Sequence, residues 1–145
     1  MGDRCFVRLC IAERDLSQFQ GHNFQWIDIP SREEWSEEVD WPGVISIDLE
    51  EVNYAGYSDW QPAAASGLRF LVNHGPGSDY GPGAYASDGK RAHFLPYSHD
   101  GEPLVVINMD NEPPTIDPAI LESAQEFQGA WNAFLAYAGE LKSTP

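Results

Sequence analysis

Four histidines are the side chains best suited to acid–base catalysis or metal binding in this sequence: His22, His74, His93 and His99. Their spacing contains neither the HExxH motif nor a short His-x-His pair. Ser98, His99 and Asp100 are consecutive, but neighbouring residues of an extended chain point to opposite faces, so they do not form a catalytic triad. We interpret the histidines as surface or turn residues and predict no catalytic residue. An enzyme is one alternative, in which His74, His93 and His99 would line a single cleft.

A glycine-rich segment at residues 75–83 suggests an anion-binding loop, because closely spaced backbone amides can surround a phosphate. It lacks the Gly-Lys-Ser/Thr ending of a P-loop, and its Asp79 would repel phosphate. We therefore expect a connection between two strands. Its length is unusual for a hairpin connection, and Tyr80 and Tyr85 are candidate recognition residues.

The acidic composition raises the question of a calcium site at residues 108–117. An EF-hand loop starting at Asn108 would lack the glycine of its sixth position and would have Ala119 in place of the final glutamate. No EF-hand is predicted. An irregular oxygen-ligand site made by Asp110, Glu112 and Asp117 is an alternative, and we predict neither a metal nor a cofactor.

Charge is distributed unevenly along the chain. The sequence contains 23 acidic and 8 basic side chains, a formal net charge of −15. Residues 28–59 hold ten acids and one base, whereas residues 1–27 hold three of each, and residues 60–145 hold ten acids and four bases. Such a charge disfavours direct binding to nucleic acid. The acidic region either keeps the protein soluble or forms a docking face for a basic protein.

Aromatic side chains accompany these acids and could anchor a partner that the carboxylates attract. Trp26, Trp35 and Trp131 occupy positions expected in the core, which leaves Trp41 and Trp60 as exposed anchors. The predicted partner-binding residues are Glu33, Glu34, Glu37, Glu38, Asp40, Trp41, Asp48, Glu50, Glu51, Tyr57, Asp59, Trp60, Asp79 and Tyr80.

Period-two alternation in the first half of the chain predicts the strands that must position these residues. It indicates strands at residues 5–12, 22–29 and 44–49, the last reaching Tyr54 at most. On the first strand, Cys5 and Cys10 lie on opposite faces and cannot form a disulfide with each other. A short turn or helical piece is expected at residues 15–19.

Two connecting segments carry most of the predicted docking residues. Ser31 and Glu34 match a capping box, which predicts a short helix at residues 32–39 with Trp35 and Val39 on one face. Residues 55–66 mix Gly, Ser, Pro and Ala, so a loop is predicted there.

The second half of the chain predicts a meander followed by a long helix. Strands are expected at residues 68–73, 84–87, 90–97 and 104–109, with hairpin turns at Asp88-Gly89 and Asp100-Gly101. Asp117 caps and Pro118 opens a helix that runs to about Leu141, with apolar residues at helical spacing. The expected fold is α+β, an antiparallel, meander-rich sheet packed on one face by this C-terminal helix, with one short helix in the N-terminal half.

Length and cysteine content indicate a single domain, residues 1–145, in the cytoplasm. The chain is of single-core size. Its two cysteines lack CxxC spacing and suit a reducing compartment. The N-terminus does not match a signal peptide, and no apolar run is long enough to span a membrane, so no membrane partner is expected.

A small, strongly acidic α+β domain without a catalytic motif resembles the immunity proteins that bacteria make against polymorphic or contact-delivered toxins. The resemblance lies in size, charge and fold class. It implies that the protein is not an enzyme but neutralises a basic toxin domain by occluding its active site in a one-to-one complex. A DNA-mimic or anti-defence inhibitor and a structural adaptor are alternatives from other classes.

Overall fold

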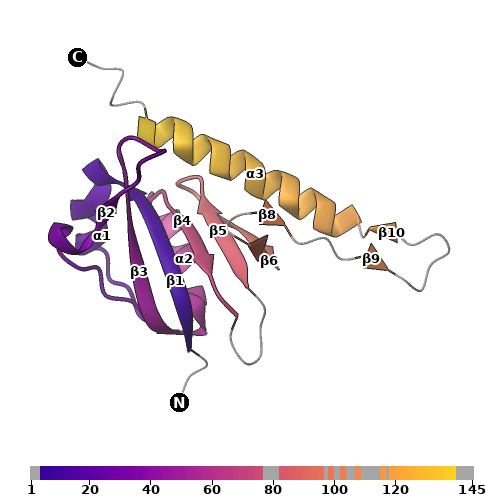
Figure 1. The fold of residues 1–145 in the computed structure, drawn as a ribbon, viewed down its shortest axis with the longest axis horizontal. Coiled ribbons are helices and arrows are strands. Elements are labelled where there is room, and N and C mark those ends of the chain that lie inside the picture. Colours follow the sequence, from indigo (N-terminus) through magenta and orange to yellow (C-terminus); the bar gives the residue numbers. More distant parts are fainter. Residues whose placement is uncertain are drawn as a thin grey trace.

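A six-stranded antiparallel sheet of order β2-β3-β1-β4-β5-β6 organises the chain (Figure 1). The computed structural model describes residues 4–76, 82–96, 98–99, 102–103, 107–108, 115–116 and 118–139. From one edge to the other, the strands are β2 (Ser36–Glu37), β3 (Val44–Asn53), β1 (Arg4–Ala12), β4 (Leu71–His74), β5 (Gly83–Ser87) and β6 (Ala92–Pro96). The α+β class and the β4-β5-β6 meander predicted from the sequence are confirmed.

The second half of the central strand β1 is apolar on both sides, whereas Arg8 and Phe6, on the same face as Cys10, are exposed. Val7, Leu9 and Ile11 belong to one hydrophobic cluster, and Cys10 and Ala12 belong to another. Cys5 lies in the first cluster, so the two cysteines are on opposite faces as predicted, and both are free thiols. Burial raises the pKa of the Cys10 thiol to about 12, which makes it unreactive at neutral pH.

Helix α3 (Pro118–Gly139) packs on one face of the sheet, as expected for the long C-terminal helix (Figure 1). Its buried residues Phe127, Ala130, Phe134 and Ala138 contact a layer of small and aliphatic side chains on β4, β5 and β6. The Asp117 cap lies outside the described residues. None of the described helices is long and apolar enough to cross a membrane.

The end of α3 is fixed by Arg14, in the 3₁₀ turn η1 (Glu13–Asp15). The Arg14 guanidinium donates hydrogen bonds to the carbonyls of Tyr137 (2.6 Å) and Ala138 (3.2 Å). It also lies over the Tyr137 ring, 4.1 Å from its centroid, and the Tyr137 hydroxyl donates to Asp15. These bonds satisfy carbonyls that a helix end leaves free.

The other face is covered by α1 (Leu16–Gly21), the irregular residues 22–35 and α2 (Tyr57–Ala65). Helix α1 confirms the helical piece expected near residues 15–19. The loop predicted at residues 55–66 is wrong, because α2 occupies most of that segment. Gly56, at φ +67°, turns the chain into the helix, and Trp60 enters the core at 0% exposure. Alanines with high helix propensity follow, two of them buried, and this outweighs the loop-like composition.

The strand predicted at residues 22–29 is also wrong. The Gln25 and Trp26 amides donate to the two carboxylate oxygens of Asp59, at 2.6 and 2.7 Å, instead of to a neighbouring strand. Ile27 is buried and Phe24 is half-buried against the core, so the segment still contributes apolar contacts. The Asp59 side chain of α2 therefore accepts hydrogen bonds from two amides that would otherwise donate to a neighbouring strand.

The helix predicted at residues 32–39 is replaced by one 3₁₀ turn, η2 (Arg32–Glu34), followed by β2. Ser31 makes no side-chain capping bond. Trp35 is buried and Val39 is 93% exposed, so they do not share a face. Glutamates four residues apart would repel one another in a helix, whereas as a strand this segment pairs with β3.

The predicted turn at Asp88-Gly89 is confirmed between β5 and β6. Gly89 has φ +86°, and one Asp88 oxygen accepts from the amides of Lys90 and Arg91. Burial alone would raise the pKa of Asp88, but these hydrogen bonds and one with His93 outweigh it and lower the pKa to about 2.

Short strand pairs precede α3. β7 (Ser98–His99) pairs antiparallel with β8 (Glu102–Pro103), as the turn predicted at 100–101 requires. β9 (Ile107–Asn108) pairs with β10 (Thr115–Ile116). Of the strand expected at residues 104–109, only β9 lies within the described residues, and the three acids of the alternative calcium site lie outside them.

Candidate functional site

The predicted docking residues are concentrated at the edge of the sheet, in a segment that we name the acidic hairpin, residues 33–43. It comprises the end of η2, β2 and the turn into β3. The Glu38 amide donates to the Val44 carbonyl, and the Glu13 amide donates to the Gly43 carbonyl at 2.9 Å. Gly43 has φ +88°, and a Cβ there would lie 2.9 Å from the Ala138 carbonyl oxygen. The turn is therefore held against β1 and the end of α3, and glycine is required at its base.

Most carboxylates of the acidic hairpin are exposed. Glu33, Glu34, Glu37 and Asp40 face solvent. Arg32, the only base between residues 28 and 59, is engaged by Glu13 at 2.5 Å and by Glu37 at 3.3 Å. Glu38 is half-buried and accepts a hydrogen bond from the Ser46 hydroxyl. A single guanidinium shared by two carboxylates leaves the hairpin with a large negative excess.

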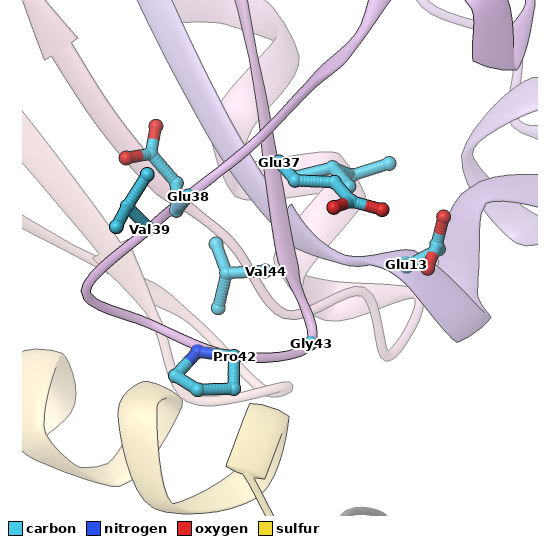
Figure 2. A pocket seen from close by; sticks show the side chains of 8 residues that line it. Glu13, Glu37, Glu38, Val39, Pro42, Gly43 and Val44 are labelled. Atoms are coloured by element: carbon cyan, nitrogen blue, oxygen red, sulfur yellow. The ribbon is translucent and has the colours of Figure 1, made fainter.

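A pocket of about 280 Å³ lies beside this hairpin (Figure 2). It is lined by Glu13, Glu37, Glu38, Val39, Pro42, Gly43, Val44 and Ile45. In Figure 2 the carboxylates of Glu13 and Glu37 lie on one side of the hairpin and that of Glu38 on the other. A wall of aliphatic and acidic groups suits a side chain with an apolar stem and a cationic end, such as lysine or arginine.

Two of the predicted partner-binding residues, Asp59 and Trp60, are buried, which corrects the prediction. Asp59 is 4% exposed and holds the amides of residues 25 and 26, and Trp60 is fully buried. Both belong to the structural core and cannot touch a partner. Tyr57, the first residue of the same helix, is 59% exposed.

The division of the tryptophans into buried and exposed residues differs from the prediction. Trp35 and Trp131 pack into the core clusters as expected, whereas Trp26 is 36% exposed and its indole donates to Ser58. Trp41 is half-buried and makes an edge-to-face contact with Trp131, with ring centroids 5.7 Å apart. Trp41 therefore anchors the hairpin to α3 with one side of its ring.

The remaining predicted residues lie on β3 or outside the described chain. Asp48 and Glu50 are exposed on β3, and Asp48 forms a two-bond ion pair with Arg8 of β1, at 2.8 and 3.3 Å. Glu51 belongs to β3, but its side chain is outside the description. Asp79 and Tyr80 also lie outside the described residues.

Sequence reasoning missed Val39 and Glu13. Val39 is an aliphatic residue within a run of acids. That position in the sequence could have identified it as an exposed apolar residue. Glu13 gave no such signal, because it is distant in sequence and reaches the hairpin only through the fold.

Of the three histidines that the enzyme alternative would use, His74 and His93 lie on opposite faces of the sheet, and the side chain of His99 lies outside the described residues. His74 is buried on the face that carries Tyr85 and Phe94, and it stacks on Phe94 with ring planes 4° apart. His93 pairs with Ala86 across the sheet and therefore projects from the opposite face, where it bonds Asp88. Within the described residues, no three His, Cys, Asp or Glu side chains are grouped to hold a metal.

His74 is expected to make stability depend on pH. Burial lowers its pKa below the ordinary 6.5, against the opposing effect of its Nδ1–H bond to the Gly75 carbonyl. Between the two pKa values, the unfolded chain therefore binds a proton at His74 that the folded chain does not bind. The neutral His74 contributes a stabilisation of the folded state that is complete above about pH 6.5 and is lost as the pH falls toward the folded pKa.

We expect the free energy of unfolding of the wild type to fall more steeply between pH 7 and 5 than that of His74→Gln. The two slopes differ by the uptake of at most one proton, which corresponds to about 1.4 kcal/mol per pH unit. Urea unfolding at a series of pH values measures both slopes, with His22→Gln as the matched control for loss of a less buried histidine. Equal slopes for the wild type and His74→Gln would contradict the assignment.

Comparison with known proteins provides no relative on which to base a function. No family model matches this chain, and neither a curated protein nor a solved structure matches it. The function is therefore argued from the geometry and charge of the described residues, among which the acidic hairpin is the strongest feature.

Proposed function

We propose that this protein is a protein-binding inhibitor of the immunity type, which occludes the basic active site of a toxin domain with its acidic hairpin. The observation that carries the proposal is the unneutralised charge of that hairpin: it has four exposed carboxylates, and the neighbouring Arg32 is already shared by Glu13 and Glu37. A surface of this kind complements the basic groove with which nucleic-acid-cleaving or nucleic-acid-modifying toxins hold their substrate.

Electrostatics would set the rate of association. Exposed carboxylates raise the encounter rate with a cationic partner and make it fall with salt, since the Debye length is about 8 Å at physiological ionic strength. Val39, at the tip of the hairpin, supplies an apolar contact among the charges. Charge would therefore provide speed and selectivity, and Val39 together with Pro42 would provide the contact that excludes water.

The hairpin is also held in place before any partner arrives. Gly43 packs on the end of α3, the Glu13 amide bonds the turn, and Trp41 contacts Trp131. A preorganised surface loses little conformational entropy on binding, which favours tight inhibition.

The test uses two charge-reversal pairs of equal magnitude. Glu37→Lys/Asp40→Lys alters the hairpin, and Glu122→Lys/Glu126→Lys makes the same change on the exposed side of α3. The tagged wild type first captures its partner from host lysate at low salt, with elution by a salt gradient and identification by mass spectrometry. The captured protein is then purified, and its activity is measured with and without the inhibitor.

We expect a one-to-one complex that abolishes the partner's activity, with a Kd raised about 100-fold by the hairpin pair and less than about 5-fold by the α3 pair. The hairpin pair should also flatten the dependence of log Kd on salt. Equal effects of the two pairs would remove the hairpin from the interface. A complex that leaves the partner fully active would favour an adaptor over an inhibitor.

A further inference from the structure

Strand β3 is much longer than the strand that pairs with its outer edge. β3 has ten residues, and β2 pairs with two of them, through Ser36 opposite Ser46 and Glu37 opposite Ile45. From Ile47 to Asn53 no strand within the described ranges pairs with that edge. This stretch of β3 extends for about 20 Å, at about 3.3 Å per residue, which is the length of an ordinary strand. Its register with β1 shifts between Leu49 and Val52, so the regular part beyond β2 is residues 47–49, on either side of Asp48.

The hydrogen bonds of the hairpin show which backbone groups face outward. The Glu38 amide donates to the Val44 carbonyl, so the backbone of Val44 faces β2. Backbone groups alternate along a strand, so those of Ser46 and Asp48 face the same side. Ser46 is opposite Ser36, whereas Asp48 lies beyond the end of β2. The amide and carbonyl of Asp48 therefore point to the open edge.

The opposite edge of the sheet, along β6, is blocked at its two ends. The Gln61 side chain of α2 donates to the Ala92 carbonyl at 2.5 Å and accepts from the Ala92 amide at 3.0 Å, as a neighbouring strand would. β6 then ends at Pro96, which has no amide hydrogen to donate. The β6 edge is thus blocked at Ala92 and at Pro96, whereas the β3 edge beyond β2 could accept a strand.

We infer that the outer edge of β3, beginning at Ile47, accepts an extended basic segment of the partner as an added antiparallel strand. The inference rests on the proposed function, because it specifies how the partner of the acidic hairpin is held. Charge identifies the occupant: Asp48 and Glu50 are exposed beside this edge, and only Asp48 has a basic partner among the described side chains, Arg8. A second copy of this chain, itself at −15, would place acids against acids.

The two faces of β3 also specify the pattern of the added strand. Ser46 and Asp48 point to one face, whereas Ile47 and Leu49 point to the other and pack on the core. A strand at this edge would place alternate residues beside Asp48 and the others beside the aliphatic pair. The preferred segment therefore alternates basic and apolar residues.

The test probes backbone pairing with synthetic peptides on the wild-type protein. The probe is Lys-Val-Lys-Val-Lys-Val-Lys, blocked at both ends, and its control is Lys-Lys-Val-Val-Val-Lys-Lys, of equal charge and composition. In an antiparallel pair, a lysine opposite Asp48 directs its own amide toward β3. N-methylation of the inner lysines should therefore block pairing, whereas N-methylation of the valines should leave it intact.

We expect the alternating peptide to bind at least about tenfold more tightly than the block peptide and to slow hydrogen exchange of the Asp48 amide. N-methyl-lysine should abolish both effects and N-methyl-valine neither. Asp48→Pro, which removes the outward amide, should weaken binding at least about tenfold relative to Asp48→Asn, which has the same charge and keeps that amide. Thermal unfolding checks that Asp48→Pro folds, and the peptide comparison needs no variant.

Equal binding of the two N-methylated peptides would overturn strand addition. If the charge reversal at Glu37 and Asp40 still weakened partner binding, the proposed function would stand without strand addition. If the peptides showed strand addition but the charge reversal left partner binding unchanged, the acidic hairpin would be removed from the proposed function. The β3 edge would then remain as the binding site. A concentration-dependent dimer in sedimentation, lost in Asp48→Pro and kept in Asp48→Asn, would assign the edge to a second copy and overturn the inference.

Discussion

Replacing Trp60 by alanine is expected to lower the free energy of unfolding by about 3–5 kcal/mol. The indole is fully buried among Phe24, Phe70 and Tyr85, with ring centroids 5.4 to 6.4 Å away, and its N–H donates to the Ala55 carbonyl at 2.8 Å. Alanine would leave a cavity between α2 and the sheet and an unpaired carbonyl. Urea unfolding followed by circular dichroism measures the loss without relying on tryptophan emission.

Tyr57→Ala is the matched control, because Tyr57 is an aromatic residue of the same helix that is largely exposed. We expect it to change stability by about 0.5 kcal/mol or less. A loss for Trp60→Ala no greater than that of Tyr57→Ala would show that Trp60 is not a core residue. Trp60→Phe, which keeps most of the apolar volume, should leave partner affinity unchanged, as a residue outside the interface requires.

The elements that were predictable from sequence are those in which a local pattern and the tertiary environment agree. Alternation located β1 and β3, and the spacing of Phe127, Phe134 and Ala138 located α3. The Asp-Gly pair located the β5–β6 turn, because an aspartate that caps two amides and a glycine at positive φ are sufficient for that turn. In these elements the tertiary environment favours the same backbone conformation that the local pattern predicts.

Two of the three errors in secondary structure occurred where a distant residue determines the conformation. Residues 22–29 alternate as a strand does, yet Asp59, more than 30 positions later, takes two of their amides. The capping box at Ser31 and Glu34 is a local signal, and it is overridden by pairing of residues 36 and 37 with β3. Neither outcome can be derived from a window of local sequence.

The candidate site was predictable in its charge and unpredictable in its exposure. Counting acids located the region of residues 28–59, because charge per segment needs no coordinates. The count could not separate Asp40, which is exposed, from Asp59, which is buried, or Trp41 from Trp60. Each pair has the same residue types, and only packing distinguishes a surface residue from a structural one.

Asp59→Asn is expected to lower the free energy of unfolding by about 2–3 kcal/mol. Each carboxylate oxygen accepts one backbone amide, and both bonds are charge-assisted and part-buried. Asparagine has one oxygen, so its NH₂ group must face the amide of either Gln25 or Trp26. Residues 22–30 should then detach more readily from α2, and amide exchange of Gln25 and Trp26 should accelerate by a factor of at least about ten.

Asp28→Asn provides the control, because it removes the same charge from an exposed position in the same segment. We expect it to change stability by about 0.5 kcal/mol or less and to leave the exchange of both amides unaltered. The comparison also separates two roles that the sequence alone made equivalent. A partner-binding aspartate would lose affinity on substitution without losing stability, whereas Asp59, as a structural residue, should lose stability and keep the salt dependence of partner binding. Reduced affinity for Asp59→Asn at full stability would return this residue to the interface.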